Sequence, residues 1–214
     1  MKRLLGILAI TALAASAFAQ GTVILQNQTG LVQQWTSVSD STLINVPKNG
    51  GYVELLSAPA GTALANSTLS SFSSLSGFMA ANPGWSLAQG VTGGSIIGFG
   101  AGLFNGGTLS LTGIAGGAPA EYIVAGWTGA FPTYDAAYAA ALQNASASFI
   151  GLSAIDTVVT GNPSLTPPGL PVGLRPTFTG MTTLATALAP IPEPTSFALA
   201  GLGLAALLVF RRRS

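Results

Sequence analysis

Between residues 20 and 190, apolar residues occur in short runs, without the three- and four-residue repeat of amphipathic helices. Glycine, asparagine, serine and threonine separate these runs, and such residues favour turns. The apolar runs themselves are rich in β-branched and aromatic residues, as strands are. We therefore expect a mainly β domain, a single antiparallel β-sandwich. Strands are predicted at 22–27, 31–35, 51–56, 108–111, 122–127 and 154–160, with a last strand within 177–188, and turns at 29–30, 49–51, 105–107, 116–117 and 161–163.

One short helix is predicted over 132–144. Thr133 can cap its N-terminus, Asp135 falls in the first turn, where a negative charge is favourable, and the body is alanine-rich. We expect it to cover one end of the sandwich, with Tyr134, Tyr138 and Leu142 packing inward at a spacing of four.

Two further segments depart from the strand pattern. The serine-rich stretch 64–81 predicts a loop with a short helical turn. Residues 162–176 contain five prolines and predict a stiff extended connection, or stalk.

Charged residues make up 6% of the chain, against about 25% in ordinary soluble domains. Most of the cationic side chains lie at the two ends of the chain. Between them, only Lys48 and Arg175 balance five carboxylates. The central domain therefore lacks a basic face for phosphates, which excludes nucleic acid as an expected partner.

The chain contains neither cysteine nor histidine. This excludes the usual structural zinc sites, disulfides, a cysteine nucleophile and a Ser-His-Asp relay. Asp40, Glu54 and Asp156 are isolated in sequence, without the spacing of a calcium loop. The glycines in residues 98–102 lack the remaining features of a phosphate-binding loop. We therefore predict no metal and no cofactor.

The N-terminus has the three parts of a secretory signal peptide. Lys2 and Arg3 precede an apolar run over residues 4–15. Ala17 and Ala19 then supply the small residues that a signal peptidase requires. The apolar run is too short to span a bilayer. The sequence predicts a signal peptide over 1–19, export through the Sec translocon, and cleavage before Gln20.

The C-terminus combines a proline-flanked acid, an apolar stretch and a basic cluster. Prolines on both sides of Glu193 prevent a helix from continuing through this point. The apolar stretch 195–210 predicts a transmembrane helix of about 24 Å, short for a permanent span. The arginines that follow place the C-terminus in the cytoplasm and the domain outside. The motif is Pro192, Glu193 and Pro194, and the cluster is Arg211, Arg212 and Arg213.

In this three-part order, residues 189–214 resemble the PEP-CTERM protein-sorting signal, a segment also known as an ice-binding protein C-terminal motif. The resemblance implies processing near Pro192–Pro194 by an exosortase, a membrane transpeptidase of bacteria that make extracellular polysaccharide. An ordinary C-terminal membrane anchor is the alternative. Residues 50–61, 105–109, 121–127 and 133–137 are loosely similar to exported PEP-CTERM proteins of Verrucomicrobia-like bacteria. That similarity implies a shared fold and sorting route.

The expected protein is therefore an exported, noncatalytic component of the cell envelope or extracellular matrix, with its ectodomain over 20–188. One alternative is a carbohydrate-binding module that holds extracellular polysaccharide on exposed aromatic rings. A secreted glycosidase, with Glu121 and Asp135 as its carboxyl pair, is the third interpretation. Aromatic residues in strands are also typical of a core. The candidate sugar contacts are Trp35, Trp85 and Trp127.

Overall fold

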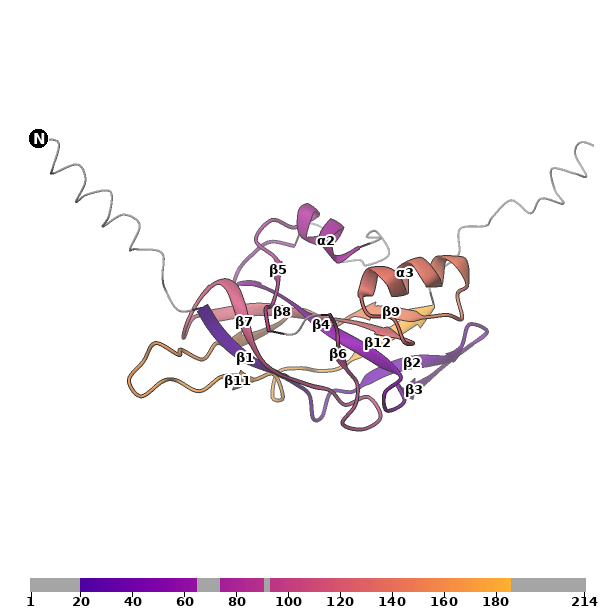
Figure 1. The fold of residues 1–214 in the computed structure, drawn as a ribbon, viewed down its shortest axis with the longest axis horizontal. Helices are drawn as coiled ribbons and strands as arrows, with labels where there is room; N and C mark the ends of the chain where they lie inside the picture. Colours follow the sequence, from indigo (N-terminus) through magenta and orange to yellow (C-terminus); the bar gives the residue numbers. More distant parts are fainter. Residues whose placement is uncertain (1–19, 65–73, 91–92, 186–214) are drawn as a thin grey trace, which may run out of the picture.

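The computed structural model describes residues 20–64, 74–90 and 93–185, which form twelve strands and two helices (Figure 1). The order along the chain is β1 (Gln20–Gln26), β2 (Val32–Ser37), β3 (Asp40–Asn45), β4 (Gly51–Pro59), α2 (Leu75–Ala81), β5 (Ser86–Leu87), β6 (Ser95–Ile96), β7 (Asn105–Ala115), β8 (Pro119–Thr128), α3 (Tyr134–Gln143), β9 (Phe149–Leu152), β10 (Asp156–Val159), β11 (Val172–Gly173) and β12 (Met181–Ala185).

The described strands form a three-stranded sheet, β11-β1-β7, and a nine-stranded sheet along the path β3-β2-β12-β9-β8-β4-β5, with β10 beside β8 and β6 beside β4. The prediction of a mainly β domain is confirmed. Two details of it were wrong. The pairs β1–β11 and β2–β12 are parallel, so the sheets are mixed, and the short helical turn predicted within 64–81 is a seven-residue helix, α2.

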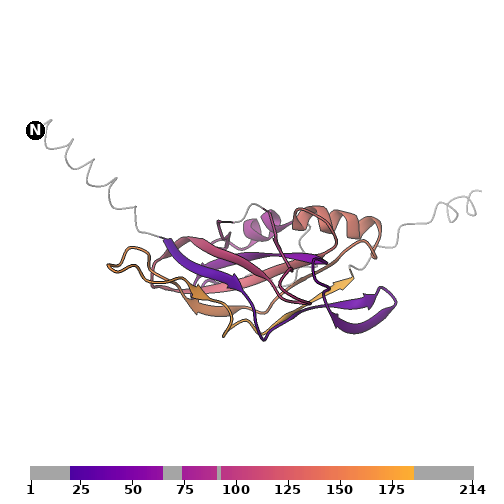
Figure 2. The same cartoon turned by 60° about the horizontal axis from the view of Figure 1, so that its bottom comes forward.

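The two sheets pack on each other through one apolar cluster, and Figure 2 shows them as stacked layers. The three-stranded sheet contributes alternate residues of β1 and β7, and the larger sheet contributes alternate residues of β4 and β8. This period of two is what a strand with one buried face requires. The facing side chains are Val23, Leu25, Leu109 and Leu111 on one side, and Val53, Leu55, Tyr122 and Val124 on the other.

A second apolar cluster fills the space between the opposite face of the nine-stranded sheet and the two helices. Figure 1 shows α2 and α3 on this side of the sheet, which we call the helix face. Helix α3 packs on β8 and β9. The strands contribute Leu56, Ile123, Trp127 and Ile150, and the helices contribute Leu75, Phe78, Tyr134 and Ala137.

Helix α3 begins where the sequence predicts, with the Thr133 side chain accepting a hydrogen bond from the Ala136 backbone N–H. Its buried face differs from the prediction. Tyr134 is buried, but Leu142 is 42% exposed. A spacing of four overshoots the helical period of 3.6, so the third member of such a series turns away from the sheet. Small side chains face the sheet in its place, namely Ala137 and Ala141.

The proline-rich segment 162–176 folds back onto the domain and is not a free stalk. Val172 pairs with Val23 of β1, and the Leu174 side chain is fully buried. The turn predicted at 105–107 was wrong, because these residues are the first three of β7, where Gly107 has a φ of 72°. Glycine adopts this conformation at no steric cost.

No helix within residues 20–64, 74–90 and 93–185 is long and apolar enough to cross a membrane. The predicted signal peptide, 1–19, and the predicted transmembrane helix, 195–210, lie outside the described residues.

Candidate functional site

The predicted processing residues at both ends of the chain lie outside the described residues. These are Ala17 and Ala19 at the N-terminus, and Pro192, Glu193, Pro194, Arg211, Arg212 and Arg213 at the C-terminus. Gln20, the predicted first residue of the mature chain, begins β1 and pairs with Ala115. β12 ends at Ala185. Six residues separate Ala185 from Pro192, so the Cα atoms of these two residues are at most about 25 Å apart.

Trp127 is a core residue. Its side chain is fully buried, and its indole N–H donates a 2.9 Å hydrogen bond to the Phe131 carbonyl. The ring stacks on Tyr52 at a centroid distance of 5.9 Å and meets Tyr134 edge-on at 6.2 Å. Buried aromatic rings in these geometries stabilise a core. The expectation that Trp127 presents a ring to a sugar was therefore wrong.

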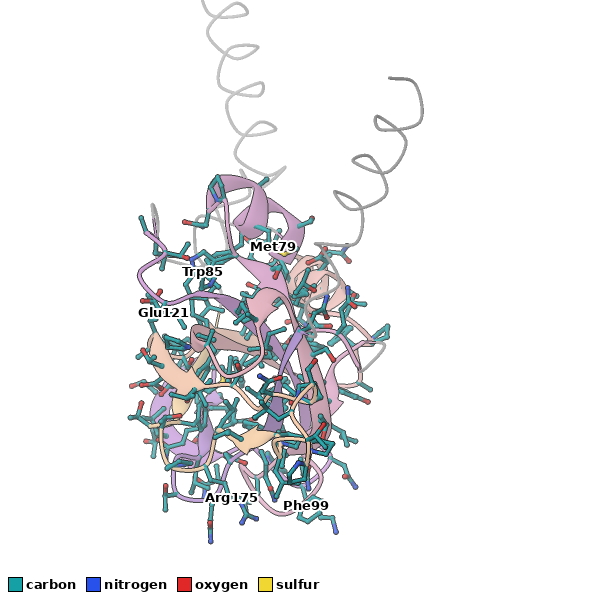
Figure 3. The ribbon with its side chains drawn as sticks, turned by 90° about the vertical axis from the view of Figure 1, so that its left-hand side faces the viewer. Met79, Trp85, Phe99, Glu121 and Arg175 are labelled. Atoms are coloured by element: carbon teal, nitrogen blue, oxygen red, sulfur yellow. The ribbon has the colours of Figure 1, made fainter. Side chains whose placement is uncertain are left out.

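Trp85 is also unavailable to a sugar. It is 4% exposed and meets Phe78 of α2 edge-on at 6.2 Å. Figure 3 shows Trp85 near Met79, on the side of the domain opposite to Arg175. Trp85 fills the space beneath a helix that the sequence indicated only as a turn, so its predicted exposure was wrong too.

Trp35 is half-buried and lies near one edge of the nine-stranded sheet. It pairs with Leu43 of β3. On its other side, Val32, Gln33 and Gln34 pair in parallel with Met181, Thr182 and Thr183, so the next residues, Trp35 and Leu184, come side by side. Paired residues point to the same face of a sheet.

These pairs continue as one row of apolar side chains across the helix face. Leu184 pairs with Ile150, Ile150 with Trp127, Trp127 with Tyr52, and Tyr52 with Ile96. Helix α3 covers the row over β8 and β9, where Trp127 and Ile150 are buried. Beyond the helix, over β12, β2 and β3, the row reaches the surface, with Leu184 42% and Leu43 45% exposed.

A polar row runs beside this exposed part. Gln33 pairs with both Asn45 and Thr182, and its side-chain amide donates a 3.5 Å hydrogen bond to the Asn45 Oδ1. We call the six residues together the Trp35 face. They are Gln33 and Trp35 of β2, Leu43 and Asn45 of β3, and Thr182 and Leu184 of β12.

A hollow of about 430 Å³ continues the Trp35 face beyond the start of β2 and β12. Its walls come from the loops before these strands, which approach closely at two glycines. A Cβ atom on Gly30 would collide with backbone atoms of Phe178 and Gly180. The lining residues are Thr29, Leu31, Gln33, Thr179, Gly180, Met181 and Thr182.

The two carboxylates predicted as a glycosidase pair each accept a hydrogen bond from a backbone N–H. Glu121 Oε1 accepts from Gly61 at 2.9 Å, and Asp135 Oδ1 accepts from Leu75 at 3.0 Å. Within residues 20–64, 74–90 and 93–185, no group of three acidic side chains is placed to hold a metal.

A second pocket, of about 510 Å³, lies at the edge of β4 between its pairings with β5 and β6. Glu54 lines it. Burial raises the pKa of this carboxyl, and the negative charge of Asp135 raises it further. The remaining lining is mostly apolar, including Leu25, Val53, Leu87 and Leu109. The isolated position of Glu54 in the sequence gave no signal for this pocket.

Comparison with known proteins identifies one segment. Residues 190–213 match the model of the PEP-CTERM protein-sorting motif. No curated protein and no solved structure matches the chain.

Proposed function

We propose that this chain, which carries a PEP-CTERM protein-sorting motif, is a noncatalytic protein of the cell envelope or extracellular matrix. The motif marks an exported protein that is transiently anchored at its C-terminus and is recognised by an exosortase-type processing enzyme. The match at residues 190–213 is the observation that carries this proposal.

The orientation follows from the charges beside the apolar stretch. Arg211, Arg212 and Arg213 are retained in the cytoplasm by the positive-inside rule, so the domain lies outside. The short link from Ala185 to Pro192 then keeps the domain against the outer face of the membrane until processing.

The hydrogen bonds of the carboxylates support a noncatalytic role. A general acid or base must be free to exchange a proton with a substrate. Glu121 and Asp135 instead anchor the backbone at Gly61 and Leu75, and Asp40 accepts from the Thr42 N–H at 2.9 Å. These three acidic side chains thus serve turns and a helix start.

The proposal is tested by separating the parts of the tail in the native host. Glu193→Gln should spare membrane insertion and block processing, so the unprocessed chain accumulates in the membrane fraction. Replacing all three arginines by glutamine should disturb orientation and retention. Glu121→Gln is the matched control, because it removes the same charge from the domain and its Oε1 still accepts from Gly61. Equal processing of Glu193→Gln and the control would contradict the proposal.

A further inference from the structure

We propose that the Trp35 face binds a neutral polysaccharide chain, laid along the seam between β2 and β12. This site goes beyond the sorting function. It requires only that the domain be outside the cell, where such polymers occur.

The two adjacent rows of the Trp35 face match the two kinds of surface on a sugar ring. One row presents the Trp35 ring between Leu43 and Leu184, which suits the apolar C–H face of a pyranose. The other row offers the side chains of Gln33, Asn45 and Thr182, which can donate to and accept from hydroxyl groups. Apolar walls with a few convergent polar groups are typical of small-molecule sites.

The lack of charged side chains on this surface favours a neutral polymer. Neither the Trp35 face nor the hollow includes a charged side chain. Charges of both signs follow along the chain, with Asp40 at the tip of the β2–β3 hairpin, Lys48 after β3, and Asp156 accepting from the Thr179 backbone N–H. An anionic polysaccharide would therefore find no cationic side chain on the Trp35 face or in the hollow to bind its charges.

The shape favours a narrow chain over a folded protein. From Trp35 to Leu31, at the hollow, four residues of extended strand give a length of about 13 Å. The apolar part consists of three side chains, whereas a stable protein interface uses roughly 20–30 residues on each side. A polymer laid along β2 can also continue past the hairpin tip, because both strands end there, at Ser37 and Asp40.

The test is retention of the purified exported protein on insoluble cellulose, with soluble dextran and alginate as neutral and anionic competitors. We expect retention that dextran reduces and alginate does not. Trp35→Ala should weaken binding at least tenfold, and Leu43→Ala and Gln33→Ala should each weaken it severalfold. Ile44→Ala is the matched control for Leu43→Ala, because Ile44 is a neighbouring, 39% exposed residue on the opposite face of the same strand.

Near-ultraviolet circular dichroism of each variant must match the wild type for its binding to be compared. Should Trp35→Ala fail this check, Gln33→Ala and Leu43→Ala decide. Lack of retention of the wild type on both neutral glucans would overturn the proposal. So would equal losses for Leu43→Ala and Ile44→Ala, or a change of oligomeric state in Trp35→Ala, which would make this face a contact between copies. Processing of the tail is measured separately, so a failure here leaves the sorting proposal standing.

Discussion

The Asp135 carboxylate accepts a 3.0 Å hydrogen bond from the Leu75 backbone N–H, so the first turn of α3 holds the first residue of α2. Ser74 satisfies a second N–H of the same helix end, that of Gly77. Free N–H groups at a helix start are costly when buried, and an acidic partner there also interacts favourably with the helix dipole. Two helices far apart in the sequence are thereby joined at their N-termini.

We therefore expect Asp135→Ala to lower the free energy of unfolding by about 1–2 kcal/mol, the range for loss of a capping or charged hydrogen bond. Urea denaturation measures this change, and hydrogen exchange should show faster exchange across Leu75–Ala81. Asp40→Ala is the control, since Asp40 is exposed and bonds only its own turn at Thr42. A larger loss in Asp40→Ala would contradict this account of α2.

Stability should fall as pH rises from acid to neutral. Burial raises the pKa of Glu54 and of Asp156, so the protonated carboxyls favour the folded state. Their contribution is complete below the ordinary carboxyl pKa of about 4 and is lost as pH rises through the raised values. The lowered pKa of Asp40, caused by its hydrogen bonds to Thr42, has the opposite effect, but that group is fully exposed.

Glu54→Gln removes the more buried of these two carboxyl groups. It should melt at a higher temperature than the wild type at pH 7, and its melting temperature should depend less on pH. Thermal unfolding followed by circular dichroism between pH 4 and pH 7 gives both quantities. A variant less stable than the wild type at pH 7 would show that the ionised Glu54 has a stabilising partner.

Trp127 and Trp35 should differ sharply when truncated. Trp127→Ala removes a fully buried ring and its hydrogen bond to Phe131, and should cost about 3–5 kcal/mol. Trp35→Ala, at a half-buried position, should cost about 1 kcal/mol or less. Denaturant titrations of the two variants provide the comparison. Similar costs would mean that the Trp35 ring is as buried as that of Trp127.

The existence of several strands could be predicted from the sequence, but that of β3 and β9 could not, nor could the strand partners. The run at 122–127 is apolar and β-branched, and it forms the middle of β8. β3 gave no signal because every residue from Asp40 to Ile44 is exposed, so no alternation of apolar and polar residues marks it. The parallel pairing of β2 with β12 joins segments near opposite ends of the domain, and nothing local specifies it.

The same limit applies to the candidate site. Trp35, Trp85 and Trp127 look alike in sequence, and their exposure depends on where the helices lie over the sheet. The polar residues of the site could be identified only from the strand register, which places Gln33, Asn45 and Thr182 in one row. The sorting tail could be recognised because its order of motif, apolar stretch and arginines is linear.

The N-terminal prediction is cleavage before Gln20. Ala17→Arg or Ala19→Arg should block it, because a signal peptidase accepts small residues at these positions. N-terminal sequencing of the exported protein should give Gln20 as the first residue. A sequence that starts at Met1 in exported material would refute the prediction.

The central claim concerns the fate of the tail, and mass spectrometry of the protein recovered from the surface or matrix of the native host tests it most directly. If the Pro192–Pro194 motif is processed by an exosortase-type enzyme, peptides from Thr195 to Ser214 should be absent from most surface molecules, while peptides of the domain up to Ala185 are abundant. Recovery of the segment from Thr195 to Ser214, intact on most of these molecules, would contradict sorting and leave a short membrane anchor.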